Sequence, residues 1–393
     1  MRVVYNSFNG RYSDSPRAVY EAVTRRGAAQ DAVWLVDREF ASTFPADVAT
    51  VPIYTDAAVE ALESADLVVS NGHLEMAWIK KPGATYVQMW HGTPLKRIHA
   101  DALGGPPGLL EHLSLDVDRW DVLLSPNPYS TETMRRAFRW SGEILETGYP
   151  RNDILRSAQA GEVRERLRRK LHIEDGRTAV LYTPTWRDDA FWDESPDRGA
   201  LALDVERFTA DLGDDHVLLA RLHYKITGMM RGVDHPAVVD VSAYPDVADL
   251  YLAADALVTD YSSTMFDFAV TGKPELFYAY DLDRYRDQLR GFYFDLSVDP
   301  PGPLSTTTEA LIADIRRLPE VRAEHQQAYA RFQDKFCPLD DGHATDRFLE
   351  RFFGASSSGS PRPATPDSAK LPWQRRRVER VTRGDDPVVA KPI

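Results

Sequence analysis

This chain of 393 residues has little of what several common protein classes depend on. Its single cysteine, Cys337, excludes an internal disulfide framework and a zinc site made of several thiolates, and it suits a reducing compartment. No stretch approaches the roughly 20 consecutive apolar residues that cross a bilayer, and the N-terminus lacks the apolar core of a signal peptide. We therefore expect a cytoplasmic protein whose contact with a membrane, if any, is peripheral.

The chain also has fewer basic than acidic residues. The 47 Lys and Arg residues are outnumbered by 60 Asp and Glu residues, which gives a formal net charge of -13. This balance argues against a protein that coats bare nucleic acid. We therefore predict no nucleic-acid partner, and we expect any bound anion to be held by a local site.

Two nucleotide-binding signatures are absent as well. No Gly-x-Gly-x-x-Gly follows the first predicted strand, and no Gly-x-x-x-x-Gly-Lys-Ser/Thr occurs. Dinucleotide redox chemistry and P-loop hydrolysis are therefore not supported, and a nucleotide would be used in another way. We predict a protein without a cofactor.

The length is sufficient for two domains of roughly 100 to 200 residues each. Short runs rich in Val, Ile and Tyr alternate with helical patterns, which predicts an α/β fold with mostly parallel sheets. Helices are predicted over 16–26, capped by Asp14 or Ser15, and over 163–171. The predicted strands cover residues 2–6, 32–36, 66–70, 85–89, 121–124 and 144–147, and then 179–183, 217–221, 238–241, 256–259 and 275–278.

The strand pattern restarts after residues 148–153, which we interpret as the domain boundary. The predicted division is a Rossmann-like domain 1–150, a second Rossmann-like domain 151–354 with closing helices, and a tail 355–393. Two doubly wound sheets in tandem would place a ligand cleft between them, at the carboxyl ends of the strands.

The tail differs from the rest of the chain in composition. It is rich in Ser and Pro and lacks apolar periodicity, so we predict disorder. Eight basic and four acidic residues give it a charge of +4, which leaves −17 for the remainder of a chain whose total is -13. A solvated extension is the favoured interpretation, and an electrostatic tether to anionic lipid is the alternative.

The first candidate site residue is His91, which follows a predicted strand and precedes a Gly and Pro turn. An imidazole of near-neutral pKa can take a proton from a hydroxyl, and Gly92 lets a substrate or backbone come close. A structural histidine at a strand end explains the sequence equally well. Lys96, a possible phosphate partner, tips the interpretation slightly towards function.

Two further clusters carry cations after predicted strands. Arg187 could bind a phosphate through its guanidinium fork, although a salt bridge to Asp188 or Asp189 is an equal alternative. Arg221 and His223 face the same side of an extended strand by the period of two. That second signal is weak by itself, because a strand-end histidine is more often structural than catalytic.

The fourth cluster runs from Asp260 through a turn of Ser262, Ser263 and Thr264 to Asp267 in the first turns of a predicted helix. Backbone N–H groups and small hydroxyls at a helix start can bind a phosphate. Simple N-capping by one of the two serines would use the same groups. Phosphate binding is slightly favoured, because the turn follows a strand of the second predicted sheet.

In this order, the motifs resemble the CDP-glycerol glycerophosphotransferase family, the teichoic-acid primases and polymerases of bacterial wall synthesis. The resemblance spans residues 7–353 and rests on eight motifs in register. The motifs are Ser-Asp-Ser-Pro-Arg at 13–17, Trp-His-Gly-Thr-Pro-Leu-Lys at 90–96, Gly-Tyr-Pro-Arg-Asn-Asp at 148–153, Pro-Thr-Trp-Arg-Asp at 184–188, Thr-Asp-Tyr-Ser-Ser at 259–263 with Phe-Asp at 266–267, Tyr-Ala-Tyr-Asp at 278–281, Arg-Gly-Phe-Tyr at 290–293 and Asp-Gly at 341–342.

The resemblance implies a GT-B-like pair of domains, with a CDP-glycerol or CDP-ribitol donor held mainly by the second and the acceptor approaching from the first. It implies transfer of glycerol phosphate to a hydroxyl of a lipid-linked wall or capsule polymer at the inner membrane face, with CMP leaving. His91 would be the general base and His223 a second essential histidine near the pyrophosphate. The expected substrate-binding residues are Lys96, Arg187, Arg221, Asp260, Ser262, Ser263, Thr264 and Asp267.

This chemistry fits the residues. A hydroxyl that attacks the β-phosphorus in line with the departing CMP needs a base, cations for the pyrophosphate and close positioning. We expect closure of the two domains to supply the positioning, and we expect no obligatory metal.

Two other functions fit parts of this pattern. A GT-B glycosyltransferase that uses a nucleotide sugar has the same fold, and only the released nucleotide would separate the two enzymes. A third hypothesis is a catalytically idle scaffold that binds a cytidine nucleotide or a wall precursor. The presence of His91, Arg187, His223 and Asp267 argues against it. The choice of glycerol or ribitol, of one unit or many, and of acceptor stays open.

Overall fold

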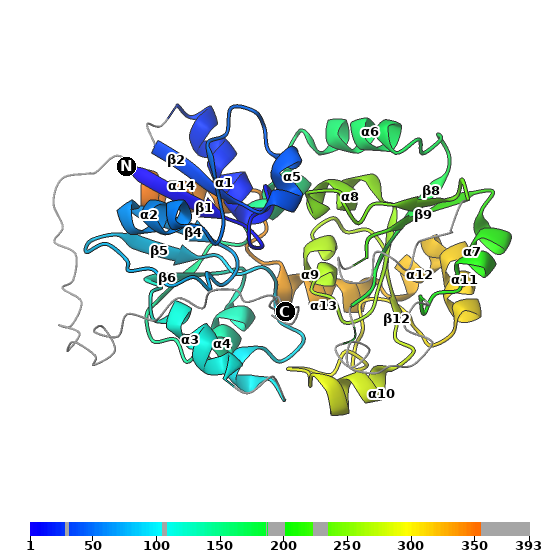
Figure 1. The fold of residues 1–393 in the computed structure, drawn as a ribbon. Coiled ribbons are helices and arrows are strands. Elements are labelled where there is room, and N and C mark those ends of the chain that lie inside the picture. Colours follow the sequence, from blue (N-terminus) through cyan, green and yellow to red (C-terminus); the bar gives the residue numbers. More distant parts are fainter. Residues whose placement is uncertain (28–30, 104–107, 186, 188–200, 223–234, 355–393) are drawn as a thin grey trace, which may run out of the picture. The chain divides into compact units, whose positions relative to one another are not determined.

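The computed structural model describes the chain apart from residues 28–30, 104–107, 186, 188–200, 223–234 and 355–393. Residues Met1–Phe353 form one compact unit that contains two parallel β-sheets (Figure 1). Hydrophobic clusters lie on both faces of each sheet, as a doubly wound α/β fold requires. The predicted fold class is therefore confirmed.

The first sheet has seven strands in the order β3-β2-β1-β4-β5-β6-β7. They are β1 (Arg2–Asn6), β2 (Asp31–Val36), β3 (Thr50–Pro52), β4 (Leu67–Ser70), β5 (Thr85–Gln88), β6 (Val122–Ser125) and β7 (Glu143–Glu146). The helical segments between them are α1 (Asp14–Arg25), η1 (Arg38–Thr43), α2 (Asp56–Ser64), η2 (His99–Asp101), α3 (Leu109–Val117) and α4 (Pro128–Ala137).

The second sheet has six strands in the order β10-β9-β8-β11-β12-β13. They are β8 (Thr178–Thr183), β9 (His216–Ala220), β10 (Val238–Asp240), β11 (Ala256–Thr259), β12 (Glu275–Tyr278) and β13 (Leu304–Ser305). The helical segments from the junction onward are η3 (Pro150–Asn152), α5 (Asp153–Arg156), α6 (Ala160–Lys170), α7 (Val205–Leu212), α8 (Val247–Ala253), α9 (Thr264–Ala269), α10 (Leu282–Arg284), η6 (Tyr285–Leu289), α11 (Thr308–Arg316), α12 (Leu318–Glu324), α13 (Gln326–Phe336) and α14 (Ala344–Phe353).

The apolar runs form strands that are buried on both faces. In β1, Val3 and Tyr5 pack into the cluster on one side of the sheet and Val4 into the cluster on the other. Successive side chains of a strand point to opposite faces, so a run with no polar gaps needs cover on both sides. Parallel pairing throughout the sheet puts the carboxyl ends of all its strands at one edge.

Each predicted strand is present with its ends within one residue, but two strands were not predicted. These are β3 and β13, which have three and two residues and lie at the edges of their sheets. Such short edge strands carry too few residues for an apolar pattern, and an edge position also tolerates Pro52.

The predicted start of the first helix is also wrong. Helix α1 begins at Asp14, with Ser13 in the N-cap position, and no side chain makes the capping hydrogen bond. The Ser13 hydroxyl instead pairs with that of Ser7 at 3.1 Å, and the Asp14 carboxylate binds Arg151. Long-range partners thus take the groups that local rules assign to capping.

Helix α14 returns to the first sheet. Its Phe348 and Leu349 are buried in the cluster that also contains Val19 and Val23 of α1, and Figure 1 draws the two helices together. The prediction had grouped this segment with the second domain. The proposed boundary near residue 150 stays a prediction. Helix α14 follows the second sheet in the sequence but packs against the first.

Two further properties concern only the described residues. No helix among them is both long enough and apolar enough to span a bilayer. Within the same residues, no three His, Cys, Asp or Glu side chains come together as a possible metal site.

Candidate active site

The central strands of the first sheet bring Asn71 and the loop of His91 together. Strands β4 and β5 are neighbours, and their chains continue beyond the carboxyl edge as Asn71 and as residues 89–92. The His91 Nδ1 lies 2.7 Å from the Asn71 carbonyl oxygen. A carbonyl can only accept, so Nδ1 carries the proton and Nε2 keeps a lone pair that can accept one.

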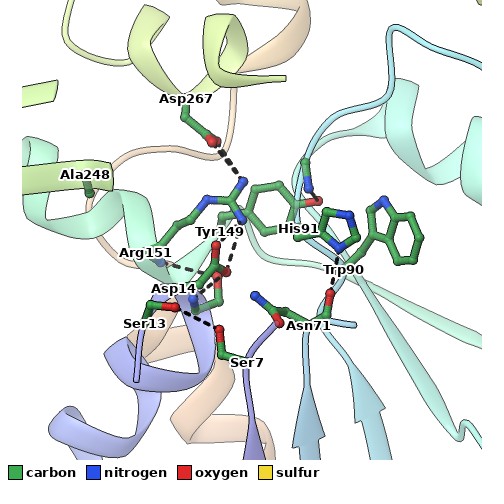
Figure 2. Close-up of polar contacts among 12 residues, drawn as sticks. Ser7, Ser13, Asp14, Asn71, Trp90, His91, Tyr149, Arg151, Ala248 and Asp267 are labelled. Atoms are coloured by element: carbon green, nitrogen blue, oxygen red, sulfur yellow. Dashed lines mark hydrogen bonds and ion pairs between the residues drawn. The ribbon is translucent and has the colours of Figure 1, made fainter. Parts of the chain in front are cut away.

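The surroundings of His91 keep its ring neutral. Burial lowers the pKa of His91 to about 4, and the hydrogen bond to Asn71 offsets only part of this effect. The ring packs against Trp90, with centroids 4.3 Å apart, and near Phe8. At neutral pH the imidazole is therefore a free base with a fixed orientation (Figure 2).

Gly92 places this loop directly against the serine turn. Its N–H donates to the Tyr149 hydroxyl at 3.1 Å, and a Cβ built on Gly92 would lie 2.6 Å from the Ser263 Oγ. No side chain larger than hydrogen fits that separation without displacement. The histidine loop of the first sheet and the Ser262–Thr264 turn after β11 are thus in contact.

Hydrogen bonds to residues at and just after the end of β8 fix the serine turn. Asp260 accepts from the N–H of Thr185 at 2.8 Å, and Thr264 pairs with Thr183 at 2.9 Å. Ser263 occupies the N-cap position of α9 without a side-chain capping bond, and Ser262 accepts from Thr264 N only at 3.4 Å. Capping therefore does not account for the two serines. Helix α9 has only six residues, so hydroxyls and N–H groups rather than a long helix dipole would bind an anion here.

Arg187 lies beside this turn, in contact with Asp260. Its guanidinium pairs with Asp260 at 2.8 Å and with Asp281 at 2.8 Å, and it packs over the rings of Tyr261, Tyr280 and Tyr285. Burial opposes its charge, but the two carboxylates outweigh burial and raise the pKa of Arg187. A salt bridge was one of the two predicted alternatives; its partners are distant in sequence, and Asp188 and Asp189 are outside the described residues.

The hydrogen bonds of the Arg221 side chain and the strand pairing of Lys96 do not involve the serine turn. Arg221 donates to the carbonyl oxygens of Tyr244, at 2.7 Å, and Val241, and burial lowers the pKa of its guanidinium. Lys96 is half-buried and pairs with Phe292 in an isolated antiparallel bridge. His223, predicted to face the pyrophosphate beside Arg221, lies outside the described residues. The roles of these residues stay predictions.

Asp267 faces a protein cation in this structure. Its carboxylate binds the Arg151 guanidinium at 2.9 Å and accepts from Asn152 at 3.0 Å, and burial raises its pKa. Arg151 also binds Asp14 at 3.1 Å, so one guanidinium joins two carboxylates. The expectation that Asp267 lines the donor pocket stays a prediction; in this structure its carboxylate pairs with Arg151 and Asn152.

The sequence analysis did not assign four residues to this site: Asn71, Tyr149, Arg151 and Asp14. Tyr149 and Arg151 lie in the 148–153 motif, which was interpreted as a domain boundary, and Asp14 was considered only as a helix cap. Their presence in the shared motifs was the one available signal. Nothing local to Asn71 indicates that its backbone carbonyl orients a histidine.

Two doubly wound sheets, with a histidine loop of one in contact with a serine turn of the other, form a GT-B-like fold. The chain belongs to the CDP-glycerol:poly(glycerophosphate) glycerophosphotransferase family, whose model matches residues 1–354. The predicted family is confirmed, and the glycosyltransferase alternative is not favoured.

Individual relatives agree with this assignment. The chain is 40% identical to a teichoic acid glycerol-phosphate transferase of Staphylococcus aureus strain NCTC 8325, over 89% of this chain and 92% of that protein. It is 36% identical to a teichoic acid poly(glycerol phosphate) polymerase of Bacillus subtilis strain 168, over 90% of this chain but 48% of the polymerase, so it spans about half of that relative.

Solved structures lead to the same family. The wall teichoic acid polymerase TagF is 35% identical, with a TM-score of 0.81 over 89% of this chain and 88% of that chain. A UDP-GlcNAc 2-epimerase of Neisseria meningitidis, 14% identical with a TM-score of 0.55, shares the fold alone.

Proposed function

We propose that this protein transfers glycerol phosphate from CDP-glycerol to a hydroxyl of a teichoic-acid-type polymer acceptor, with release of CMP. The family and its glycerol-phosphate relatives support the donor and the class of acceptor. A TagF structure obtained after soaking with CDPG supports a donor site in this fold.

The single observation that carries the proposal is the contact between Gly92, next to His91, and Ser263 of the serine turn. In-line attack on a phosphorus needs the base and the diphosphate site within reach of one acceptor oxygen. The His91 Nε2 accepts the proton of the acceptor hydroxyl as its oxygen bonds to the β-phosphorus of CDP-glycerol. The bond from that phosphorus to the bridging oxygen breaks, and CMP leaves with the bonding pair.

The proposed donor site begins at the serine turn. The hydroxyls of Ser262 and Ser263 and the adjacent N–H groups are suited to hydrogen-bond a diphosphate, with Thr264 fixed behind them by Thr183. Lys96, Arg221 and His223 are proposed as further donor-binding groups. Arg187, with both carboxylates in place, is proposed to shape the pocket wall through its tyrosine neighbours.

The proposed location is the inner face of the cell membrane, where a lipid-linked acceptor would be met. The positive charge of residues 355–393 supports an electrostatic contact with anionic lipid. The protein is proposed to use neither a cofactor nor an obligatory metal.

His91→Ala tests the proposed base. A general base contributes about 10² to 10⁴-fold to the rate, so this variant is expected to lower kcat for CMP release from CDP-glycerol by about 10³-fold. The matched control is His343→Ala, which removes an exposed histidine whose partner is Asp346 on the surface. Activity of His91→Ala within a few-fold of wild type contradicts the assignment, and release of UDP from a UDP-sugar contradicts the donor.

A further inference from the structure

The segment that joins the two sheets holds a buried arginine with a partner on each side. The Arg151 side chain is 2% exposed; its Nη1 donates to Asp14 at the start of α1, and its Nη2 donates to Asp267 of α9. Figure 2 shows the guanidinium between the two carboxylates. Because Asp14 and Asp267 flank the first and second sheets respectively, one side chain connects the two.

Tyr149, two residues earlier, continues this connection to the histidine loop. Its ring lies 4.1 Å from the Arg151 guanidinium carbon, and its hydroxyl accepts the N–H of Gly92 at 3.1 Å. Burial raises the pKa of Tyr149, so its hydroxyl stays neutral throughout the working range of pH. The N–H of Gly92, next to His91 in the chain, is thus held by the hydroxyl of a fully buried ring.

These contacts form a closed ring of neighbours. Starting from α9, Asp267 binds Arg151 and Arg151 packs on Tyr149, which holds Gly92. Gly92 in turn lies against Ser263, the residue that precedes α9. A closed ring constrains the separation of its members more strongly than any one contact, since a displacement of one must be taken up by all the others.

The backbone around the ring is similarly constrained. Asp14 and Trp90 adopt φ values of 63° and 52°, in the left-handed region that residues other than glycine seldom occupy. The ion pair fixes Asp14, and the Gln88 side chain accepts the Trp90 N–H at 2.9 Å. Such conformations persist where surrounding contacts determine them.

From this arrangement we propose that Tyr149 and Arg151 are positioning residues, which hold the His91 loop at a fixed separation from the Ser262–Thr264 turn. The proposal rests on the proposed function, because the separation matters only if the base and the diphosphate act together. Because one guanidinium serves both carboxylates, separating the two sides would take the Arg151 cation away from at least one buried carboxylate, which is a costly state. On this proposal the ion pairs hold the two halves of the site together in the folded protein; the expected closure of the two domains stays a prediction.

A purely structural role for the ion pair is the alternative. In that case substitutions would lower the melting temperature and leave the chemistry of the remaining folded enzyme unchanged. Positioning requires a loss of kcat in folded enzyme, with little change in KM for CDP-glycerol, because the donor still binds while the base is misplaced.

The test compares Tyr149→Phe and Arg151→Lys with wild type in the full chain. Tyr149→Phe removes only the acceptor of the Gly92 N–H, and Arg151→Lys keeps the charge but cannot bind both carboxylates in the same way. The matched controls are Tyr329→Phe, which loses a hydroxyl bonded to the Lys273 carbonyl, and Arg168→Lys, which replaces an arginine bonded to Asp255.

The expected result is a fall in kcat of about tenfold or more for both variants, with KM for CDP-glycerol within threefold of wild type. The ¹H–¹³C signal of the His91 ring should shift in Tyr149→Phe while most other signals stay in place. Both controls should retain kcat within about twofold.

Unchanged kcat in Tyr149→Phe and Arg151→Lys, with His91→Ala inactive, overturns the positioning proposal and leaves the proposed function intact. Full activity of His91→Ala instead refutes the proposed base. If Arg151→Lys does not fold, Tyr149→Phe decides the question by itself, since its ring still fills the site.

Discussion

A single backbone carbonyl, that of Asn71, determines which nitrogen of His91 can act as a base. The carbonyl holds the proton on Nδ1, and burial removes the charge that the ring would carry in water at mildly acidic pH. The ionic state and the direction of the lone pair are therefore both properties of the fold. Neither can be seen in the sequence around His91, whose spacing by itself fits a structural and a catalytic histidine equally well.

The state of His91 can be observed directly. Long-range ¹H–¹⁵N spectra are expected to show a neutral ring protonated on Nδ1 at pH 6, with a titration midpoint near pH 4 rather than the usual value of about 6.5. Because folding lowers this pKa, the neutral ring contributes stability that is complete above about pH 6.5 and is lost as the pH falls through 4.

His343→Ala serves to assign one exposed histidine in the same spectra, and His91→Ala assigns the ring itself. An imidazolium at pH 6, or a proton on Nε2, contradicts the inferred role of the Asn71 carbonyl.

At the scale of elements, the site depends on how two loops meet. The loop after β5 and the turn after β11 come from different sheets, and they approach so closely that Gly92 has no room for a methyl group beside Ser263. Each loop is supported by its own sheet, and the contact between them forms only when the two sheets are placed together.

Gly92→Ala tests this contact. The added Cβ would lie 2.7 Å from the Ser263 Cβ, which no side-chain rotation can move away, so the loops must separate and we expect kcat to fall by about tenfold. Ser263→Gly makes room for the methyl group. In a double-mutant cycle, Gly92→Ala should therefore be less harmful in the Ser263→Gly background, with a coupling of about 1 kcal/mol in the activation free energy.

Gly161→Ala is the control for the loss of a glycine. Gly161 lies in α6, and a Cβ there would meet nothing within 4 Å. This substitution should leave kcat unchanged and raise stability by about 0.4 to 1 kcal/mol. Additive effects of Gly92→Ala and Ser263→Gly would show that the two loops do not press on each other.

The elements themselves were mostly predictable. Long apolar runs such as those of β1 and β8 identify buried parallel strands, because both faces need cover. The edge strands β3 and β13 were missed for lack of pattern, and the start of α1 was misplaced because Ser13 and Asp14 serve distant partners. Local rules fail at the places where tertiary contacts use the same side chains.

For the whole molecule, the compact unit ends at Phe353 and the basic segment follows it. The unit is strongly acidic and the tail is positive. An anionic membrane would therefore repel the unit and attract the tail. A tether and a catalytic unit would then be separable by truncation, provided that α14 is retained, since its Phe348 is fully buried against the first sheet.

Truncation after Gly354 is expected to leave CMP release with a soluble acceptor within about twofold of the full chain. Binding to vesicles containing anionic lipid should fall by about tenfold or more, at roughly 1 kcal/mol for each basic residue close to the surface. Co-sedimentation measures this binding, with neutral vesicles and high salt as controls. Equal binding by the two forms would show that the tail is only a solvated extension.

The sequence by itself determined the α/β class, the strand positions, the family motifs and most of the candidate residues, because burial patterns and turn residues are local properties. The tertiary structure decided the partners: Arg187 with Asp260 and Asp281, and Arg151 with Asp14 and Asp267, which lie 137 and 116 residues away along the chain. These pairs depend on how two separately wound sheets are placed together. No local preference of the backbone encodes that placement, and a charged side chain reveals its role only when the group that neutralises it is known.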